Sequence, residues 1–522
     1  MADKPGTPKR KKASTSRKRT SRRRPPKPPQ TQAEKLEREI FLQNRHHVQE
    51  HHSHDSAWHA LPPGGISDVR RYATGYMRAL AHKHHRLRAD YLCNELERAG
   101  YVEMDLETAL TADMESLGNR KKFYARRGLM VFGIQVGLKG IEEGMHIVAA
   151  HIDSPCLRAT DHPLRQNYNQ AGIQCMHYGG IKSNDFMNIP LAMYIHAALR
   201  NREGKLEERH IIIGDDNGEP HFFAPSAAFH YTNEEAEMDA LRVLIGNRPY
   251  NDKGFNPKKT VILQAMNGLR RTTQTQITER DIEDADIWFF PAGQARFADL
   301  DKSIIAAPGQ DNMATAYALL RGFIGTTRPE YTKLAIWYSG EEVGDAGAGS
   351  LRQNTFSDVV TPAITFLRGK ESGHEHKGLR NGWSLFLDVT APGSPSQMGL
   401  HDVKDCAYMG AGPVLVYSGG DTGAYGGYDS DPVFRSMFRR VLDDNDIPHH
   451  VAMMGSQEER IANASDIFHT TLGTRGIDAA ISILGMHRGI EHVAAIDAYY
   501  LERLVRAFYG VKNHAKYEIP LK

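Results

Sequence analysis

The chain has 522 residues, of which 40% are hydrophobic, enough to bury an ample core spread over roughly two or three domains. No run of about 18 apolar residues occurs, which excludes a membrane-spanning helix, and no apolar secretion signal stands near the start. The four cysteines form no CxxC pair and no dense framework, so we expect a protein of the reducing cytoplasm.

Charge is concentrated at the beginning of the chain. Residues 1–30 contain twelve Lys and Arg and one acidic residue, a net charge of +11, which leaves −9 for the rest of a chain whose total is +2. Such a basic stretch, rich in Pro, Ser and Thr, buries too little apolar surface to fold alone, so we expect disorder. It either has no specific partner or binds nucleic acid, an anionic membrane surface or an acidic protein through its charge.

Residues 31–65 look like a short polar helix followed by a His-rich linker, so we assign 1–65 to a disordered basic, Pro- and His-rich N-terminal extension. We interpret its histidines as part of a solvated leader rather than as a metal site. Apolar residues from 68 to 99 have helical spacing, and Gly100 ends the pattern. This helix is expected to begin the folded body.

The folded body contains two kinds of sequence pattern, which we assign to two domains. Short apolar runs alternating with amphipathic stretches predict a buried sheet with crossover helices over 66–160 and 301–522, ending in a helix around 494–509. Between them, over 161–300, the runs HIIIG, HFFAP, KTVILQ and DIWFF predict an inserted, strand-rich domain. The expected fold class is α/β, a mixed sheet sandwiched by helices with an inserted β-rich domain.

Potential metal ligands stand at the ends of the apolar runs. They are His151 and Asp153 after MHIVAA, Asp311 at the start of QDNMATAYALL, Glu341 and Glu342 after LAIWYSG, Asp388 at the end of WSLFLD, and His487 at the end of ISILGMH. In an open α/β sheet, ligands bind in the crevice outside the carboxyl ends of the strands. Residues far apart in sequence are therefore expected to converge there.

Two imidazoles and three carboxylates suit divalent zinc, cobalt or manganese. One bridging carboxylate lets two ions lie roughly 3.5–4 Å apart, and such a pair ionises a bound water near neutral pH. The remaining carboxylate can act as general base. The sequence thus predicts a two-metal hydrolase in which one of two adjacent glutamates ligates while the other faces the substrate.

In order, the strings HIDSPCLR, QDN, SGEEVGD, LDVTAP and MHRGIE resemble the motifs of the aspartyl aminopeptidase (aminopeptidase I) family of dinuclear zinc peptidases, over roughly residues 66–522. The resemblance implies a zinc exopeptidase-like fold. It implies that one metal is held by His151, Asp311 and Asp388, and the other by Asp311, Glu342 and His487. It makes Glu341 the general base, and Asp153 would orient the His151 ring.

The similarity extends to HYGG at His177–Gly180, to FFAPSAAFH ending at His230, and to AGPV at Ala411–Val414. It implies that 161–300 is a dimerisation domain and that His230 contributes to substrate binding in the neighbouring subunit's active site. It also implies a closed homo-oligomer, a dodecamer built of dimers.

Three departures from the family motifs bear on specificity. Ala411 and Val416 stand near where members that prefer acidic substrates carry lysines, NDFMNIPL replaces a WFDRDL-like segment, and Arg488 follows the ligand His487. A buried substrate carboxylate without a positioned cation is costly. The sequence therefore favours a neutral or apolar first residue at least as much as an acidic one.

Each candidate also has an ordinary structural explanation. A lone buried histidine is usually a core residue, and an EE pair is usually a solvated helix face. Asp311 could cap a helix, Asp388 could start a turn, and His230 could be a partly buried residue on an edge strand. Cys156 is expected to pack as a small apolar residue. The ordered set of motifs favours the metal site over these explanations.

We therefore expect a metal-dependent aminopeptidase that removes the first residue of peptides, with two divalent ions per subunit. Two other functions stay open. One is a dinuclear metal amidohydrolase acting on N-acylated amino acids, which the same ligands could serve. The other is an inactive scaffold that binds nucleic acid through the basic tail.

Overall fold

The computed structural model describes residues 55–104, 121–201, 203–216, 218–228, 230, 241–250, 260–273, 277–345, 349–351, 375–395, 406–419, 428–452, 469 and 473–518. His54–Lys522 forms one compact unit. The disordered extension predicted over 1–65, including its basic tail and most of its histidines, lies largely outside the described residues.

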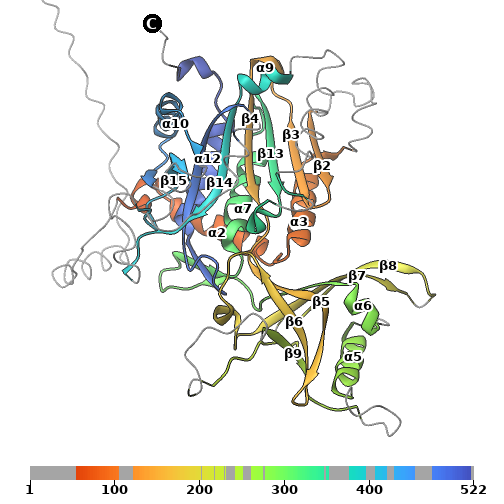
Figure 1. Cartoon of the computed structure of the whole chain (residues 1–522). Coiled ribbons are helices and arrows are strands. Elements are labelled where there is room, and N and C mark those ends of the chain that lie inside the picture. The colour runs from red at the N-terminus through yellow and green to blue at the C-terminus, as the bar shows by residue number, and fades with distance from the viewer. Residues whose placement is uncertain are drawn as a thin grey trace, which may run out of the picture. The chain divides into compact units, whose positions relative to one another are not determined.

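A large mixed sheet carries the candidate site (Figure 1). Across the sheet the order is β1 (Val102–Glu103), β2 (Lys122–Arg127), β3 (Met130–Gln135), β13 (Thr332–Tyr338), β4 (Met145–His151), β14 (Trp383–Thr390), β19 (Arg475–Leu484), β20 (Glu491–Ala494), β12 (Ile304–Ala307) and β11 (Arg296–Phe297). β15 (Val414–Val416) pairs with β19 and with β18 (His450–Ala452). A separate short ladder joins β16 (Ser418–Gly419) and β17 (Tyr428–Asp429).

The central strands are parallel, with β4 between β13 and β14, and β14 beside β19. Every residue of β4, β13 and β14 is buried, as expected for strands covered on both faces. The last residues of β4 and β13, His151 and Tyr338, are directly paired. The carboxyl ends of these strands therefore meet at one edge of the sheet, and this edge holds the candidate ligands.

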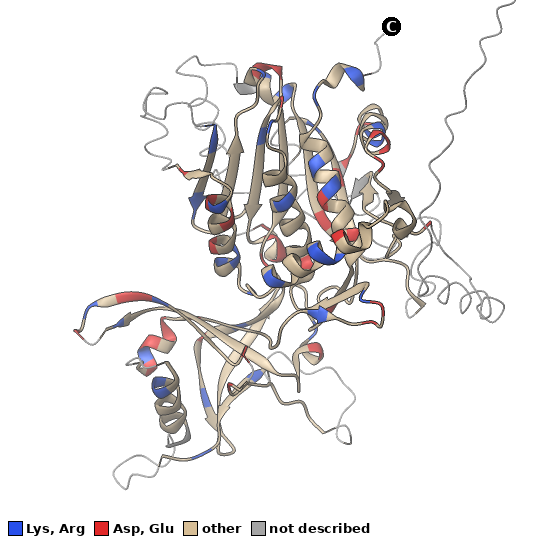
Figure 2. Cartoon of the chain, turned by 180° about the vertical axis from the view of Figure 1, so that it is seen from behind, with Lys and Arg blue, Asp and Glu red and all other residues tan. Residues whose placement is uncertain are grey.

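Helices α2 (Gly65–Ala79), α3 (His85–Arg98), α7 (Gln310–Gly325), α10 (Pro432–Asp444) and α12 (Ala495–Tyr509) share one hydrophobic cluster with one face of the sheet. Along β4 the faces alternate: Val148 and Ala150 join this cluster, whereas Ile147 and Ala149 join a second cluster on the other face. Figure 2 shows these helices in front of the sheet, with basic and acidic residues interspersed on their outer sides. The predicted terminal helix is confirmed by α12, while a helical layer on the second face stays a prediction.

The remaining short helices are η2 (Ala57–Ala60), η4 (Ile141–Glu143), η5 (Ser183–Phe186), α6 (Glu279–Glu283), η8 (Glu341–Val343), α9 (Glu375–Arg380) and η10 (His514–Lys516). In the described residues, no helix is both long and apolar enough to cross a membrane.

The single helix predicted over 68–99 is wrong in its middle, because the chain breaks between α2 and α3. His84 caps α3 by accepting the N–H of Arg86 at 3.2 Å. The ammonium of Lys83 is buried and donates to the carbonyls of Pro291 and Gly293 at 3.0 and 2.8 Å. These contacts join residues far apart in sequence and favour a break between the two helices. The helical spacing of apolar residues does not reveal them.

A second sheet is antiparallel throughout, in the order β8 (Leu206–Ile213), β7 (Leu191–Arg200), β10 (Asp286–Pro291), β5 (Cys156–Asn167), β6 (Gln170–Tyr178) and β9 (Arg242–Gly246). Along the sequence these strands begin at Cys156 and end at Pro291, near the limits predicted for the 161–300 insertion. Those limits, and a role in dimerisation, stay predictions. From Thr260 on, the run KTVILQ is not a strand but the start of α5 (Thr260–Thr273). The buried residues Ile262 and Met266 lie one helical turn apart, a spacing that favours a helix. The β-branched residues of this run favour a strand, but the helical spacing determines the structure.

Candidate metal centre

His151 ends β4 at the carboxyl edge of the sheet and is almost completely buried. Its Nδ1 lies 3.4 Å from Oδ1 of Asp153. The other oxygen of Asp153, Oδ2, accepts the hydroxyl of Tyr178 at 2.9 Å and the backbone N–H of Glu342 at 3.2 Å. Asp153 is thus fixed by three elements and leaves Nε2 of His151 directed toward the other carboxylates.

Asp311 lies between two imidazoles. Its Oδ1 is 3.5 Å from Nε2 of His151, and its Oδ2 is 3.2 Å from Nε2 of His487. Asp311 stands near the start of α7, where the backbone is kinked. Its Oδ1 accepts no hydrogen bond from the described residues and its Oδ2 faces His487, so its carboxylate does not cap the helix.

Glu341 and Glu342 form η8, directly after the end of β13, between Gly340 and Gly344, which both have positive φ. Oε2 of Glu341 is 4.0 Å from Nε2 of His151, and Oε2 of Glu342 is 3.4 Å from Nε2 of His487. The side chains are only 15% and 2% exposed, so the interpretation as a solvated helix face is wrong. The two adjacent glutamates face different histidines.

Asp388 and His487 complete the cluster. Asp388 lies inside β14 rather than at the start of a turn, and its Oδ1 is 3.5 Å from Nε2 of His151. His487 follows β19 with φ 61°, a left-handed conformation that is rare for a non-glycine residue. Its Nδ1 lies 2.9 Å from the carbonyl oxygen of Gly180. That contact fixes the ring and leaves Nε2 facing Asp311.

The cluster contains three groups of potential ligands whose atoms lie within 4.8 Å of one another: His151, Asp311 and Asp388; Asp311, Glu342 and His487; and His151, Glu341 and Glu342. The first two groups share Asp311 and have the same members as the two ligand sets that the family resemblance implies. The role of these residues as metal ligands stays a prediction.

The pKa values of both histidines and of three carboxylates in this cluster are raised, for different reasons. Burial raises the pKa of Glu341, Glu342 and Asp388, and the neighbouring carboxylates raise it further. Burial lowers the pKa of His487, but the charge of Asp311 outweighs it and brings the value to about 9. Burial lowers the pKa of His151, but its four carboxylate neighbours outweigh burial and raise it. A concentration of buried negative charge of this kind demands protons or cations.

The donor set fits divalent cations. Oδ1 of Asp311 and Oε1 of Glu342 are buried and have no hydrogen-bond partner among the described residues. Orphaned carboxylate oxygens are costly unless a cation or a donor meets them. Imidazole nitrogen and carboxylate oxygen together suit zinc and related first-row ions. The residues present are therefore chemically suited to metal ions.

Supporting residues that the sequence did not reveal hold the ligands. Glu491 is buried and accepts the backbone N–H of Asp311 through Oε2 and that of His487 through Oε1, both at 3.0 Å. Arg88, on α3, donates to the carbonyls of Ile152 and Gly309 at 2.8 and 2.9 Å. Glu491 stands in the string MHRGIE, which was a signal for it, whereas nothing in the sequence marks Arg88.

His230 does not join the cluster. It lies in an exposed turn and belongs to none of the potential ligand groups found among the described residues. Cys156, by contrast, packs in an apolar cluster with Tyr194, Trp288 and Phe290, as predicted.

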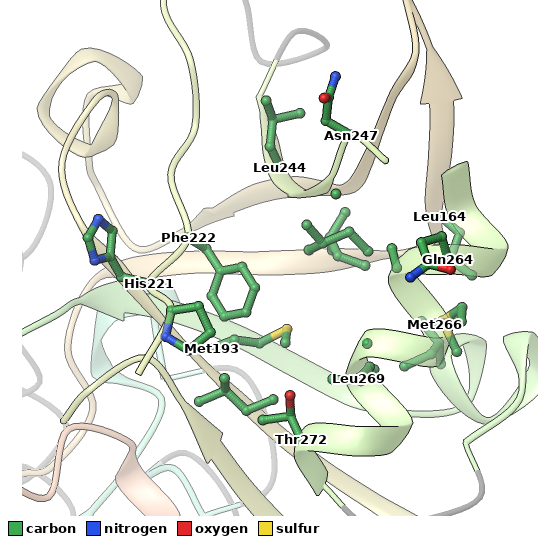
Figure 3. A pocket seen from close by; sticks show the side chains of 18 of the residues that line it. Leu164, Met193, His221, Phe222, Leu244, Asn247, Gln264, Met266, Leu269 and Thr272 are labelled. Carbon is green, nitrogen blue, oxygen red and sulfur yellow. The ribbon is translucent and has the colours of Figure 1, made fainter. Parts of the chain in front are cut away.

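An apolar cavity lies apart from the metal centre. It has a volume of about 460 Å³ between α5 and the six-stranded sheet, and Met193, Phe222, Leu244 and Leu269 line it (Figure 3). None of the metal-centre residues lines this cavity, so the charged cluster remains the candidate site.

A buried cluster of imidazoles and carboxylates at the carboxyl edge of a mixed α/β sheet defines a metal-dependent hydrolase. Residues 83–509 match the family model described as aminopeptidase I zinc metalloprotease (M18). The chain belongs to this family and is a metallo-aminopeptidase.

Individual relatives agree with this assignment. A probable M18 family aminopeptidase 1 of Borrelia garinii subsp. bavariensis is 27% identical over 466 residues, covering 87% of this chain and 98% of the relative. The crystal structure of the M18 aminopeptidase from Thermotoga maritima has a TM-score of 0.77 at 24% identity, covering 88% and 99%. The mApe1 dodecamer of S. cerevisiae has a TM-score of 0.66 at 14% identity, covering 84% and 96%.

Proposed function

We propose that this aminopeptidase cleaves the first peptide bond with two divalent cations per subunit. One would be held by His151, Asp311 and Asp388, and the other by Asp311, Glu342 and His487. The observation that carries the proposal is the position of Asp311, whose two oxygens lie 3.5 and 3.2 Å from different histidines. A bridging carboxylate is the arrangement that two-metal hydrolases use.

The cations, most simply zinc as in the family description, would polarise the scissile carbonyl and acidify a water molecule. Glu341 acts as general base, taking a proton from the water and giving it to the leaving amine. Burial raises the pKa of Glu341, which makes it a stronger base than a solvated glutamate. Its Oε2 lies 4.0 Å from Nε2 of His151, whereas the nearest oxygens of Asp311 and Asp388 lie 3.5 Å from it.

Asp153 positions His151. It accepts from Tyr178 and from the backbone of Glu342, so it links the ring of the first ligand set to the glutamates. A carboxylate beside the distal nitrogen of a metal-bound imidazole fixes its tautomer and its orientation. Asp153 is therefore proposed as a positioning residue.

The preferred first residue of the substrate is proposed to be neutral. Ala411 and Val416 are buried and apolar. The guanidinium of Arg488, the cation next to His487, is already paired with the carboxylate of Asp185. An acidic substrate side chain would thus lack a free cation from these positions, and its desolvation would be costly.

The test compares aminoacyl p-nitroanilides that carry leucine, alanine, aspartate or glutamate, each as the free amine and as the N-acetyl form. We expect hydrolysis of the free amines only, with kcat/KM for leucine or alanine at least tenfold above that for aspartate. Release of acetate from N-acetyl-leucine or N-acetyl-alanine, measured in parallel, would support the amidohydrolase instead. A preference for aspartate would overturn the specificity proposal while leaving the aminopeptidase activity in place.

We further propose a homo-oligomer in which the region 161–300 forms the dimer contact and His230 reaches the active site of a neighbouring subunit. The similarity to a dodecameric yeast enzyme and the exposed position of His230 support this arrangement. Sedimentation velocity on the full chain tests it, with a monomer at micromolar concentration as the contrary result. We do not propose nucleic-acid binding, because no observation favours it.

A further inference from the structure

A second group of potential metal ligands lies outside the metal centre, on the hairpin of β7 and β8. His196 of β7 stands directly opposite His210 of β8, and Glu208 precedes His210 by two residues on the same face. The ligand atoms of these three residues lie within 4.8 Å of one another. The hairpin is visible in Figure 1, and in Figure 2 it carries both acidic and basic residues.

The contacts within this group are close. Nε2 of His196 is 2.7 Å from Oε1 of Glu208, and Nε2 of His210 is 3.6 Å from the same oxygen. The two imidazole rings are stacked, with centroids 4.6 Å apart and an angle of 10° between their planes. Both Nε2 atoms therefore lie near one carboxylate oxygen, and rotation of the exposed side chains would turn these atoms toward a shared cation.

A supporting hydrogen bond fixes the ring of His210. Its Nδ1 lies 2.6 Å from the hydroxyl of Tyr194, a buried residue of β7 whose ring stacks on His84 at 4.0 Å. When Nδ1 donates to Tyr194, the proton is kept away from Nε2, which is left with a free lone pair. Metal-binding histidines are generally oriented by such a partner on the second nitrogen.

We infer that His196, Glu208 and His210 form a further zinc site, distinct from the catalytic metals, on the β7–β8 hairpin at the edge of the six-stranded sheet. Three protein ligands leave a fourth position for water, as in open tetrahedral zinc sites. Because β8 is the last strand on this side of the sheet, a bound ion would fasten it to β7 and stabilise the hairpin.

Zinc content per subunit tests the site. The full chain is incubated with Zn²⁺ alone, desalted and analysed by mass spectrometry, alongside His210→Gln, Glu208→Gln and the double variant His196→Asn/His210→Gln. Arg209→Gln is the matched control, since Arg209 lies on the same strand between two ligands but points to the opposite face. Unchanged aminopeptidase activity shows that each variant is folded.

We expect the double variant to hold one zinc fewer per subunit than the wild type, and the Arg209 variant to match the wild type. Zinc should also raise the Tm of the wild type more than that of the double variant. Equal zinc content in all proteins, or an equal loss in the Arg209 control, would overturn the proposal. In an Asp311→Asn background the hairpin zinc should persist, so this result does not depend on the catalytic metals.

Discussion

Glu491 accepts the backbone N–H of Asp311 at 3.0 Å, and its second oxygen accepts the N–H of His487 at the same distance. One carboxylate thus sets the backbone positions of two proposed ligands that are far apart in sequence. In Glu491→Gln one of these acceptors becomes an amide donor that faces an N–H. We expect zinc affinity to fall about 10- to 100-fold, as for other supporting residues of metal sites. Competition with a fluorescent chelator measures it, and an unchanged affinity would contradict the role.

Substitution of Glu341 should lower the rate alone, whereas substitution of Asp311 should lower both the metal content and the rate. Glu341→Gln should keep both metals and lose about 10²- to 10⁴-fold in kcat, the usual contribution of a general base. Asp311→Asn should lose both metals and activity, because the bridge is gone. Metal content and rate are measured on the same samples. Full activity of the Glu341 variant, or full metal content of the Asp311 variant, contradicts the assignment.

His230→Ala is expected to lower kcat/KM by at least tenfold without releasing metal, because the residue is proposed to act on substrate and not on the cations. Mixing the inactive Glu341→Gln and His230→Ala proteins, then reassembling them, should restore part of the activity if the residue acts across subunits. A wild-type rate in His230→Ala rejects the role. Absence of any recovery in the mixture rejects the contribution between subunits.

The metal-free protein should become less stable as pH rises from about 6.5 to 9. Folding raises the pKa of His487 from 6.5 to about 9 and that of Glu491 from 4.5 to about 8, the latter mainly through burial. In both cases the folded state binds the extra proton, so the stabilisation present at low pH is lost through this range. Calorimetry of chelator-treated protein tests the slope. A Tm that increases over this range would be inconsistent with these shifts.

Zinc should reverse that trend, because bound metal requires neutral imidazole and ionised carboxylate. The increase in Tm on adding zinc should grow between pH 6.5 and 9 as proton competition fades. The same calorimetry with saturating zinc provides the comparison.

Lys83 is expected to matter for stability more than for chemistry. Its ammonium pairs with Asp215 and donates to two carbonyls, and it is only 8% exposed. Lys83→Met leaves Asp215 without this partner, which should cost about 3 kcal/mol of unfolding free energy. Lys205→Met, at an exposed position, is the control and should change stability by less than about 0.5 kcal/mol. Urea unfolding measures both, and equal effects would contradict the account.

Most strands of the large sheet, and the convergence of the candidate ligands at one edge of it, could be predicted from the sequence because both follow local rules. Buried parallel strands appear as short apolar runs, and a ligand at the end of each run needs only the strand direction to be placed. His151 and Asp388 are examples, one at the end of β4 and one near the end of β14. The ordered motifs then separated these residues from ordinary core histidines and caps.

Other features depend on contacts that local patterns do not contain. The break between α2 and α3 is set by Lys83 reaching carbonyls about 200 residues away in sequence. The helical start of α5 was concealed by an apolar run that resembles a strand. The supporting role of Arg88, and the pairing of His196 with His210, become visible only when the chain is folded.

The most direct test of the bridging position of Asp311 is anomalous diffraction at the zinc absorption edge from crystals grown with zinc. We expect two peaks per subunit in the metal centre, about 3.5–4 Å apart and on either side of the Asp311 carboxylate. A single peak there, or peaks that do not contact Asp311, would contradict this expectation.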